Sequence, residues 1–281
     1  MIFTFSCWDG FCERLHKKGI HSIPAQLLMS EKPESNYVVF KHDVETKVAN
    51  AVRMAEIEHK WGHKGSYYVQ AYLIEDEKNV QMLKKIQDMG HEISYHYDVM
   101  DSNRGDISLA IVDFEEKRKS FEGKGFQIIT VCQHGNPIIE RVGYNSNRDF
   151  FRNEKVKEKF PHISDIMVDF KDKAFGGTDY LYFSDAGRKF KLIYDPINND
   201  IIPSEDKNIP FKKLELLWSC VEEKSANAII STHPHRWMRS KMGYILRTAI
   251  FKVVKAIAKV LIKIPVFKKF MSKYYYLAKK I

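Results

Sequence analysis

Short apolar runs alternate with helix-period segments along the chain from residue 37 onward. Runs rich in β-branched and aromatic residues predict strands, and apolar residues spaced three or four positions apart predict helices. The expected strands are 37–40, 65–70, 91–96, 127–132, 166–170, 180–183 and 228–232, and the expected helices are 48–61, 80–89 and 107–122. This alternation predicts an α/β domain built on a parallel sheet or barrel.

Polar side chains follow four of the predicted strands. They are His42, Asp43 and Glu45 after the first strand, His96 and Asp98 after the third, His134 after the fourth and His233 after the last. In α/β folds the carboxyl ends of parallel strands gather on one face and build the active site, so these residues are expected to share a pocket. Any single one of them could instead be an ordinary surface or helix-capping residue.

The residue types in this cluster suit metal-assisted hydrolysis. Side chains two apart on a strand point to the same side, so Asp43 and Glu45 face one site. One carboxylate can ligate a divalent ion while the other acts as general base, and His96 and His134 can complete the ligand set. His233, on a different strand, is then free to act as general acid.

Five segments together resemble the polysaccharide deacetylase (NodB-homology) family. They are VVFKHDVE (38–45), AEIEHKWGHKGSYYV (55–69), GHEISYHYD (90–98), HGNP (134–137) and IISTHPHRW (229–237). The resemblance implies an irregular (β/α) barrel that removes acetyl groups from N-acetylated sugars with a divalent metal ion, usually zinc. The substrate is then an N-acetylated glycan, and the basic C-terminal segment described below leads us to expect a membrane-proximal or lipid-linked one.

The resemblance also implies a role for each matching residue. Asp43 takes the position of the general base, and Glu45 and His96 take those of metal ligands. His233 takes the position of the general acid. The segment YFSDAGRKF (182–190) is similar to a family segment whose aspartate faces the site, which makes Asp185 a substrate-binding candidate.

The chain departs from the family pattern at Met100. Family members repeat a histidine four residues after the first, where this chain has a thioether, which is a poor ligand beside carboxylate and imidazole groups. Either another residue supplies the third ligand, His134 and Asp98 being the nearest by position, or the metal site is degenerate. We assign His134 to the metal and to substrate binding.

The net charge of +9 belongs to the C-terminal segment. Residues 238–281 contain twelve Lys or Arg and no Asp or Glu, whereas residues 1–237 contain 33 basic and 36 acidic side chains. A groove that binds nucleic acid should carry its basic side chains on the folded domain. Residues 1–237 have no such excess, so no nucleic-acid partner is expected for this part of the chain. The expected domains are a deacetylase-like barrel over 1–237 and a basic amphipathic helical tail over 238–281.

The tail has the composition of an interfacial helix. Four lysines fall within about 80° of a helix over 250–264, and apolar residues lie opposite. They are Lys252, Lys255, Lys259 and Lys263. Pro265 ends this helix and a second basic and aromatic piece follows. We expect the tail to bind an anionic membrane surface. The alternative is a helix that packs its apolar stripe on the body; calmodulin-like or nucleic-acid binding by the tail is a lesser possibility.

The rest of the sequence bears on compartment and on rival functions. The first residues lack the pattern of a secretory signal, and the four cysteines form no CxxC pair, so we expect a cytoplasmic protein associated peripherally with the inner face of the membrane.

Two functions other than deacetylation remain open. One is an inactive, membrane-attached glycan-binding or assembly protein, and the other is a glycoside hydrolase that pairs Asp43 with Glu45 or Asp185.

Overall fold

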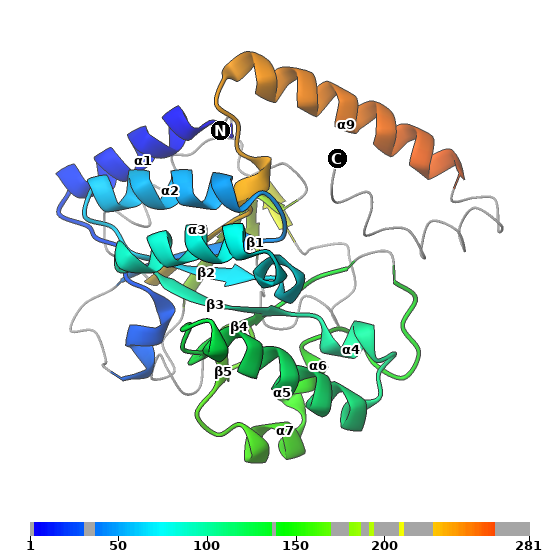
Figure 1. The fold of residues 1–281 in the computed structure, drawn as a ribbon. Coiled ribbons are helices and arrows are strands. Elements are labelled where there is room, and N and C mark those ends of the chain that lie inside the picture. The colour runs from blue at the N-terminus through cyan, green and yellow to red at the C-terminus, as the bar shows by residue number, and fades with distance from the viewer. Residues whose placement is uncertain are drawn as a thin grey trace.

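A curled parallel sheet forms the centre of the protein (Figure 1). The computed structural model describes residues 3–30, 37–136, 139–169, 180–186, 191–193, 208–210 and 227–261. Within these ranges the strands are β1 (Val38–Val44), β2 (Gly65–Val69), β3 (Glu92–Tyr97), β4 (Thr130–Gln133), β5 (Ser164–Asp165), β6 (Tyr180–Ser184), β7 (Lys191–Ile193), β8 (Asn208–Pro210) and β9 (Asn227–Thr232). Their order is β5-β4-β3-β2-β1-β9-β6-β7-β8.

Seven neighbouring strands of this sheet, β5 to β6 in that order, are parallel and curl into a half-barrel, whereas β7 and β8 pair antiparallel. Helices α1, α2 and α3 lie side by side along one face of the sheet (Figure 1). The described helices are α1 (Phe5–Lys17), α2 (Val48–Lys60), α3 (Glu77–Asp88), α4 (Val99–Ser102), α5 (Ile107–Gly123), α6 (Asp149–Arg152), α7 (Glu154–Lys159) and α9 (Lys241–Leu261), with short 3₁₀ turns η1 (Ala25–Met29), η2 (Ala71–Glu75) and η6 (Pro234–Arg236). The expected α/β architecture is confirmed, and the expected barrel is present as a half-barrel.

The β1 strand is longer than its apolar run predicts. It continues past Phe40 to Val44, so Lys41 and Asp43 lie inside the strand rather than in a loop. The two faces of β1 are both buried but differ in character. Val39 packs in the barrel interior with Tyr68 and Ile229, and the period of two places Lys41 and Asp43 on that same side.

Two further expectations need correction. The predicted strand at 166–170 is a turn over 166–169, because the buried Asp165 carboxylate accepts a hydrogen bond of 2.6 Å from the Met167 amide and bends the chain just after β5. Residue 170 lies outside the described residues. Helix α1 is not predicted at all, although Trp8, Phe11 and Leu15 follow helical spacing and are buried against the outer face of β1.

Helix α9 begins at Lys241, nine residues before the predicted start, and runs along the top of the molecule in Figure 1 (orange). Met238 fixes the position of the chain just before α9. Its amide donates to Phe3 O at 2.9 Å, and its carbonyl accepts from Phe5 N at 3.0 Å. Pro265 and the second basic piece lie outside the described residues. Among the described helices, none is both long and apolar enough to cross a membrane.

Candidate metal and catalytic site

Three side chains from the ends of three parallel strands form a possible metal-binding group. Glu45 follows β1, His96 lies near the end of β3 and His134 follows β4. One potential ligand atom from each residue lies within 4.8 Å of the other two. The parallel order β1-β2-β3-β4 brings these residues together from positions far apart in the sequence.

The imidazole of His96 is oriented for ligation. Its Nδ1 lies 3.0 Å from the carbonyl oxygen of Cys132, which can only accept, so Nδ1 carries the proton and Nε2 keeps its lone pair. Burial lowers the pKa of His96 to about 3, so the ring is neutral near pH 7. A neutral imidazole with a free Nε2 is the form that binds metal ions.

The loop after β4 is held in place around His134. The His134 amide donates to Tyr97 O at 2.7 Å, and its carbonyl accepts from Asn147 Nδ2 at 2.8 Å. Its Nε2 lies 3.4 Å from Glu45 Oε1. Burial acts to raise the pKa of Glu45, but His134, His233 and His235 together outweigh burial and hold that pKa well below its usual value.

These donors fit a divalent ion. Two ligand atoms that each lie about 2.0–2.1 Å from a tetrahedral zinc ion are roughly 3.4 Å apart, which matches the Glu45–His134 separation. Two imidazoles and one carboxylate form a ligand set found in catalytic zinc sites, where a further position stays open. Glu45, His96 and His134 are therefore the residues that would hold the metal.

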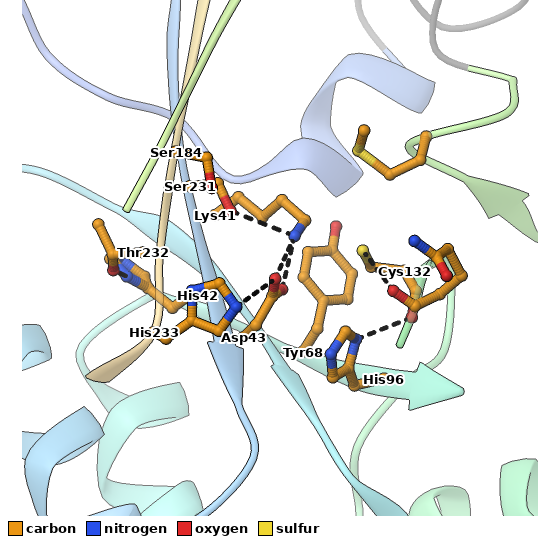
Figure 2. Close-up of polar contacts among 12 residues, drawn as sticks. Lys41, His42, Asp43, Tyr68, His96, Cys132, Ser184, Ser231, Thr232 and His233 are labelled. Atoms are coloured by element: carbon orange, nitrogen blue, oxygen red, sulfur yellow. Dashed lines mark hydrogen bonds and ion pairs between the residues drawn. The ribbon is translucent and has the colours of Figure 1, made fainter. Parts of the chain in front are cut away.

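The second possible metal-binding group consists of Asp43, His96 and Cys132. Its carboxylate is already paired with a buried lysine. The Lys41 ammonium lies 2.6 Å from both oxygens of Asp43 and 3.4 Å from Ser231 Oγ. Figure 2 shows it between the Asp43 carboxylate and Ser231, beside the Tyr68 ring. Burial also raises the pKa of the Cys132 thiol, which disfavours the thiolate that metal binding requires.

The Asp43 carboxylate lies next to the possible metal-binding group of Glu45, His96 and His134 and is ionised. Burial acts to raise its pKa, but the charge and the hydrogen bonds of Lys41, with a smaller contribution from the neighbouring histidines, outweigh burial and lower it. The Nε2 atom of His233 lies 3.7 Å from Asp43 Oδ2 and 3.9 Å from Glu45 Oε1. Asp43 and His233 therefore lie close to the three possible metal ligands.

The Asp185 carboxylate holds His233 from behind. It accepts from His233 Nδ1 at 2.6 Å and from the His233 amide at 3.0 Å, and also from Arg236 Nη1 and Trp237 Nε1, both at 3.1 Å. Burial acts to raise the pKa of Asp185, but His233 and Arg236 outweigh it and bring the pKa to about 2. Asp185 is fully buried and lies behind His233, and its contact with substrate stays a prediction.

The position that departs from the family pattern is part of the apolar core. Met100 lies in α4, is 4% exposed and packs in the core cluster that includes Phe114 and Phe150. Of the two candidates for a third ligand, the structure groups His134 with Glu45 and His96. Asp98 instead is partly exposed and lies 4.0 Å from Lys117.

His42, part of the strand-end cluster in the sequence, faces the opposite side of β1. Its Nδ1 lies 2.7 Å from Thr232 Oγ1, and its Nε2 lies 2.9 Å from the buried carboxylate of Glu58 in α2. His42 is therefore away from the candidate site. Lys41 is the site residue that sequence reasoning missed, and the alternation Val39, Lys41, Asp43, Glu45 is the signal that places it on the inner face.

Comparisons with known proteins give structural neighbours alone. No family profile and no curated protein matches the chain by sequence. A mutant of BA3943, described as a CE4 family pseudoenzyme, aligns at a TM-score of 0.42 and 16% identity over 80% of this chain and 64% of that chain. Wild-type BA3943 from Bacillus anthracis aligns at a TM-score of 0.41 and 14% identity, again over 80% of this chain and over 63% of its own.

A mutant of the peptidoglycan deacetylase PdaC from Bacillus subtilis aligns at a TM-score of 0.31 and 10% identity, over 80% of this chain and 98% of that chain. The chain thus spans less than two thirds of the length of the BA3943 neighbours. The BA3943 neighbours are described as members of the CE4 family.

Proposed function

We propose that this protein is a metal-dependent hydrolase that removes the acetyl group from an N-acetylated sugar. The observation that carries the proposal is the convergence of Glu45, His96 and His134 within 4.8 Å, beside Asp43 and His233. The sugar substrate is supported by the five segments that resemble the polysaccharide deacetylases, because the geometry alone supports metal-assisted hydrolysis and identifies neither the bond that is cleaved nor the amine that is released.

The site residues divide the reaction between two sides of the amide bond. A divalent ion held by Glu45, His96 and His134 would polarise the acetyl carbonyl and lower the pKa of water. Asp43 accepts a proton from the attacking water as the new C–O bond forms. His233, through Nε2, donates a proton to the sugar nitrogen as the C–N bond breaks. The products are acetate and the free amino sugar.

Lys41 and Asp185 hold the two proton-transfer groups in position. Both oxygens of Asp43 lie at hydrogen-bond distance from the Lys41 ammonium, which fixes the plane of the carboxylate. The carboxylate of Asp185 fixes the ring of His233 by its contact with Nδ1, so that Nε2 faces the site.

A catalytically inactive glycan-binding protein is the second candidate. The observation that favours it is the ion pair between Lys41 and Asp43, because a carboxylate with a lowered pKa is a weaker base. The glycoside hydrolase is less well supported. That mechanism needs one carboxyl group with a raised pKa as acid, and the pKa values of Asp43, Glu45 and Asp185 are all lowered.

The decisive experiment is metal analysis of the purified protein together with an acetate-release assay over a panel of N-acetylated glycans. Stoichiometric zinc or another divalent ion with acetate release is expected. Asp43→Asn should keep the metal and lose about 10²–10⁴-fold in turnover, because the base is removed while the ligands remain. Asp98→Asn, at a neighbouring strand end, is the matched control and should keep both.

Wild-type protein that binds the metal and a glycan but releases no acetate would favour the inactive glycan-binding protein. Wild-type turnover in Asp43→Asn would show that this residue is not the base. Because Asp43→Asn leaves the Lys41 charge unpaired, circular dichroism and thermal unfolding should accompany the assay, with Lys41→Met/Asp43→Asn as the variant that removes both charges.

We expect His233→Ala to lower kcat by about 10²–10⁴-fold with little change in KM, because a general acid acts in the chemical step. Steady-state kinetics on a soluble N-acetylated substrate measures this, and His162→Ala, on an exposed turn, is the control. A change confined to KM would make His233 a substrate contact. His235 is then no substitute acid, because burial lowers its pKa to about 3 and leaves it neutral.

A further inference from the structure

The apolar stripe of α9 faces solvent. Its members are between 49% and 75% exposed and follow helical spacing, so that they line one side of the helix. They are Met242, Ile245, Leu246, Ile250, Val253 and Ile257. An ordinary surface helix packs such a stripe against the core, whereas α9 exposes its stripe to solvent.

Contacts from the other side of α9 hold it to the body. Arg247 Nη1 donates to His235 O at 2.9 Å, and the ring of Tyr244 lies 5.9 Å from that of Phe3. At 100° per residue, Tyr244 is about 160° around the helix from Leu246. The exposed stripe therefore points away from the body because the opposite side makes the attachment, which argues against a tail that packs its apolar residues on the barrel.

The charge of this segment limits what can cover the stripe. The segment 238–281 has twelve basic side chains and no acidic one. A second copy of the chain would bring two such segments together, which like-charge repulsion opposes. A nucleic acid would meet the positive charge but would leave the apolar stripe in water. An anionic lipid surface matches both features, because it offers headgroup charge and an apolar interior.

We propose that α9 is a membrane-docking helix that inserts the stripe Met242–Ile257 into an anionic lipid surface. The attachment is peripheral and combines burial of the apolar side chains with attraction of the basic ones. Each basic group near the surface adds to the attraction, and salt weakens that part within a Debye length of about 8 Å at 0.15 M ionic strength. The proposal depends on α9 and not on the hydrolase chemistry.

Co-sedimentation of the full-length protein with vesicles tests the proposal. The protein should sediment with vesicles of mixed phosphatidylglycerol and phosphatidylcholine at low salt, and much less with phosphatidylcholine alone. Ile245→Asn/Leu246→Asn/Val253→Asn should weaken binding by about tenfold or more, because three inserted apolar side chains are lost. Raising the ionic strength to about 1 M, where the Debye length is about 3 Å, should release most wild-type protein.

Equally exposed apolar residues elsewhere provide the matched control. Leu109→Asn/Val112→Asn/Val142→Asn removes side chains that are 54% to 82% exposed away from α9 and should leave vesicle binding unchanged. Acetate release from a soluble substrate should be unaffected in both triple variants, which separates failure of docking from failure of catalysis. Static light scattering and a DNA-duplex binding assay complete the comparison.

Three results would overturn membrane docking. The first is wild-type protein that does not sediment with anionic vesicles at low salt. The second is equal sedimentation of wild-type protein and the α9 triple variant. The third is a dimer, or a DNA complex, that the α9 variant abolishes while neither protein binds vesicles, since the stripe would then serve a second copy or a nucleic acid.

Discussion

Replacement of Glu45 by glutamine should remove bound zinc and acetate release together. The amide side chain would keep the size of the original but lose the ionised oxygen that lies 3.4 Å from His134 Nε2. Loss of metal catalysis removes several kcal/mol of transition-state stabilisation, and 1.36 kcal/mol is tenfold in rate, so a decrease of about 10³-fold or more is expected. His96→Ala should behave in the same way. Inductively coupled plasma mass spectrometry and the acetate assay measure the two losses.

Glu75→Gln is the matched control, since this glutamate is exposed at the end of η2 and belongs to neither possible metal group. It should keep both metal and activity. Full zinc occupancy in Glu45→Gln would contradict the assigned ligands. The group of Asp43, His96 and Cys132 would then be the next to examine, with Cys132→Ser as its test.

Replacement of Lys41 by methionine should have the largest effect on stability. Lys41 and Asp43 are both buried, and removal of one partner leaves an uncompensated charge in the barrel, at a cost of about 3–5 kcal/mol in the free energy of unfolding. Urea unfolding of protein treated with a chelator measures this cost without a metal ion that could offset the lost charge. Lys41→Met/Asp43→Asn should recover a large part of the stability, because no buried charge is left alone.

The pH dependence of unfolding provides an independent check on this ion pair. The pKa of Asp43 is lowered from 3.8, so its contribution to stability is complete above that pH and is lost as the pH falls through the folded pKa. The pKa of Lys41 is raised well above 10.5, so its contribution is complete below that pH and is lost only at higher pH. The difference in stability between wild-type protein and Lys41→Met should therefore be largest between pH 3.8 and 10.5. Stability effects that simply add in the double variant would contradict the coupling.

The sequence predicts the sheet well where strands are apolar on both faces. The strand at 228–232 is read directly from its apolar residues, since β9 is buried throughout between β1 and β6. Hydropathy underestimates β1 because Lys41 and Asp43 neutralise each other inside the barrel, which a residue-by-residue scale does not register. It misplaces the strand near 166 because the Asp165 side chain makes a local hydrogen bond to Met167 N and ends the ladder.

The candidate site is predictable in part for a similar reason. Glu45, His96 and His134 follow separate strands, so strand-end reasoning alone suggests that they meet. The position of Asp185 behind His233, which is 48 positions away in the sequence, depends on the pairing of β6 with β9 and leaves no periodic signal. The outward face of α9 is also invisible in the sequence, because an amphipathic pattern does not state which side is attached.

The short connection before α9 limits the distance between the candidate site and the surface that the helix binds. Trp237 is fully buried and Met238 is hydrogen-bonded on both sides, so two residues, Arg239 and Ser240, separate the body from the helix. Two extended residues span about 7 Å. A docked molecule would thus hold its strand ends at a nearly constant height above the lipid headgroups. Sugars carried close to the bilayer would fall within its reach, and those projecting farther on a long polymer would pass beyond it.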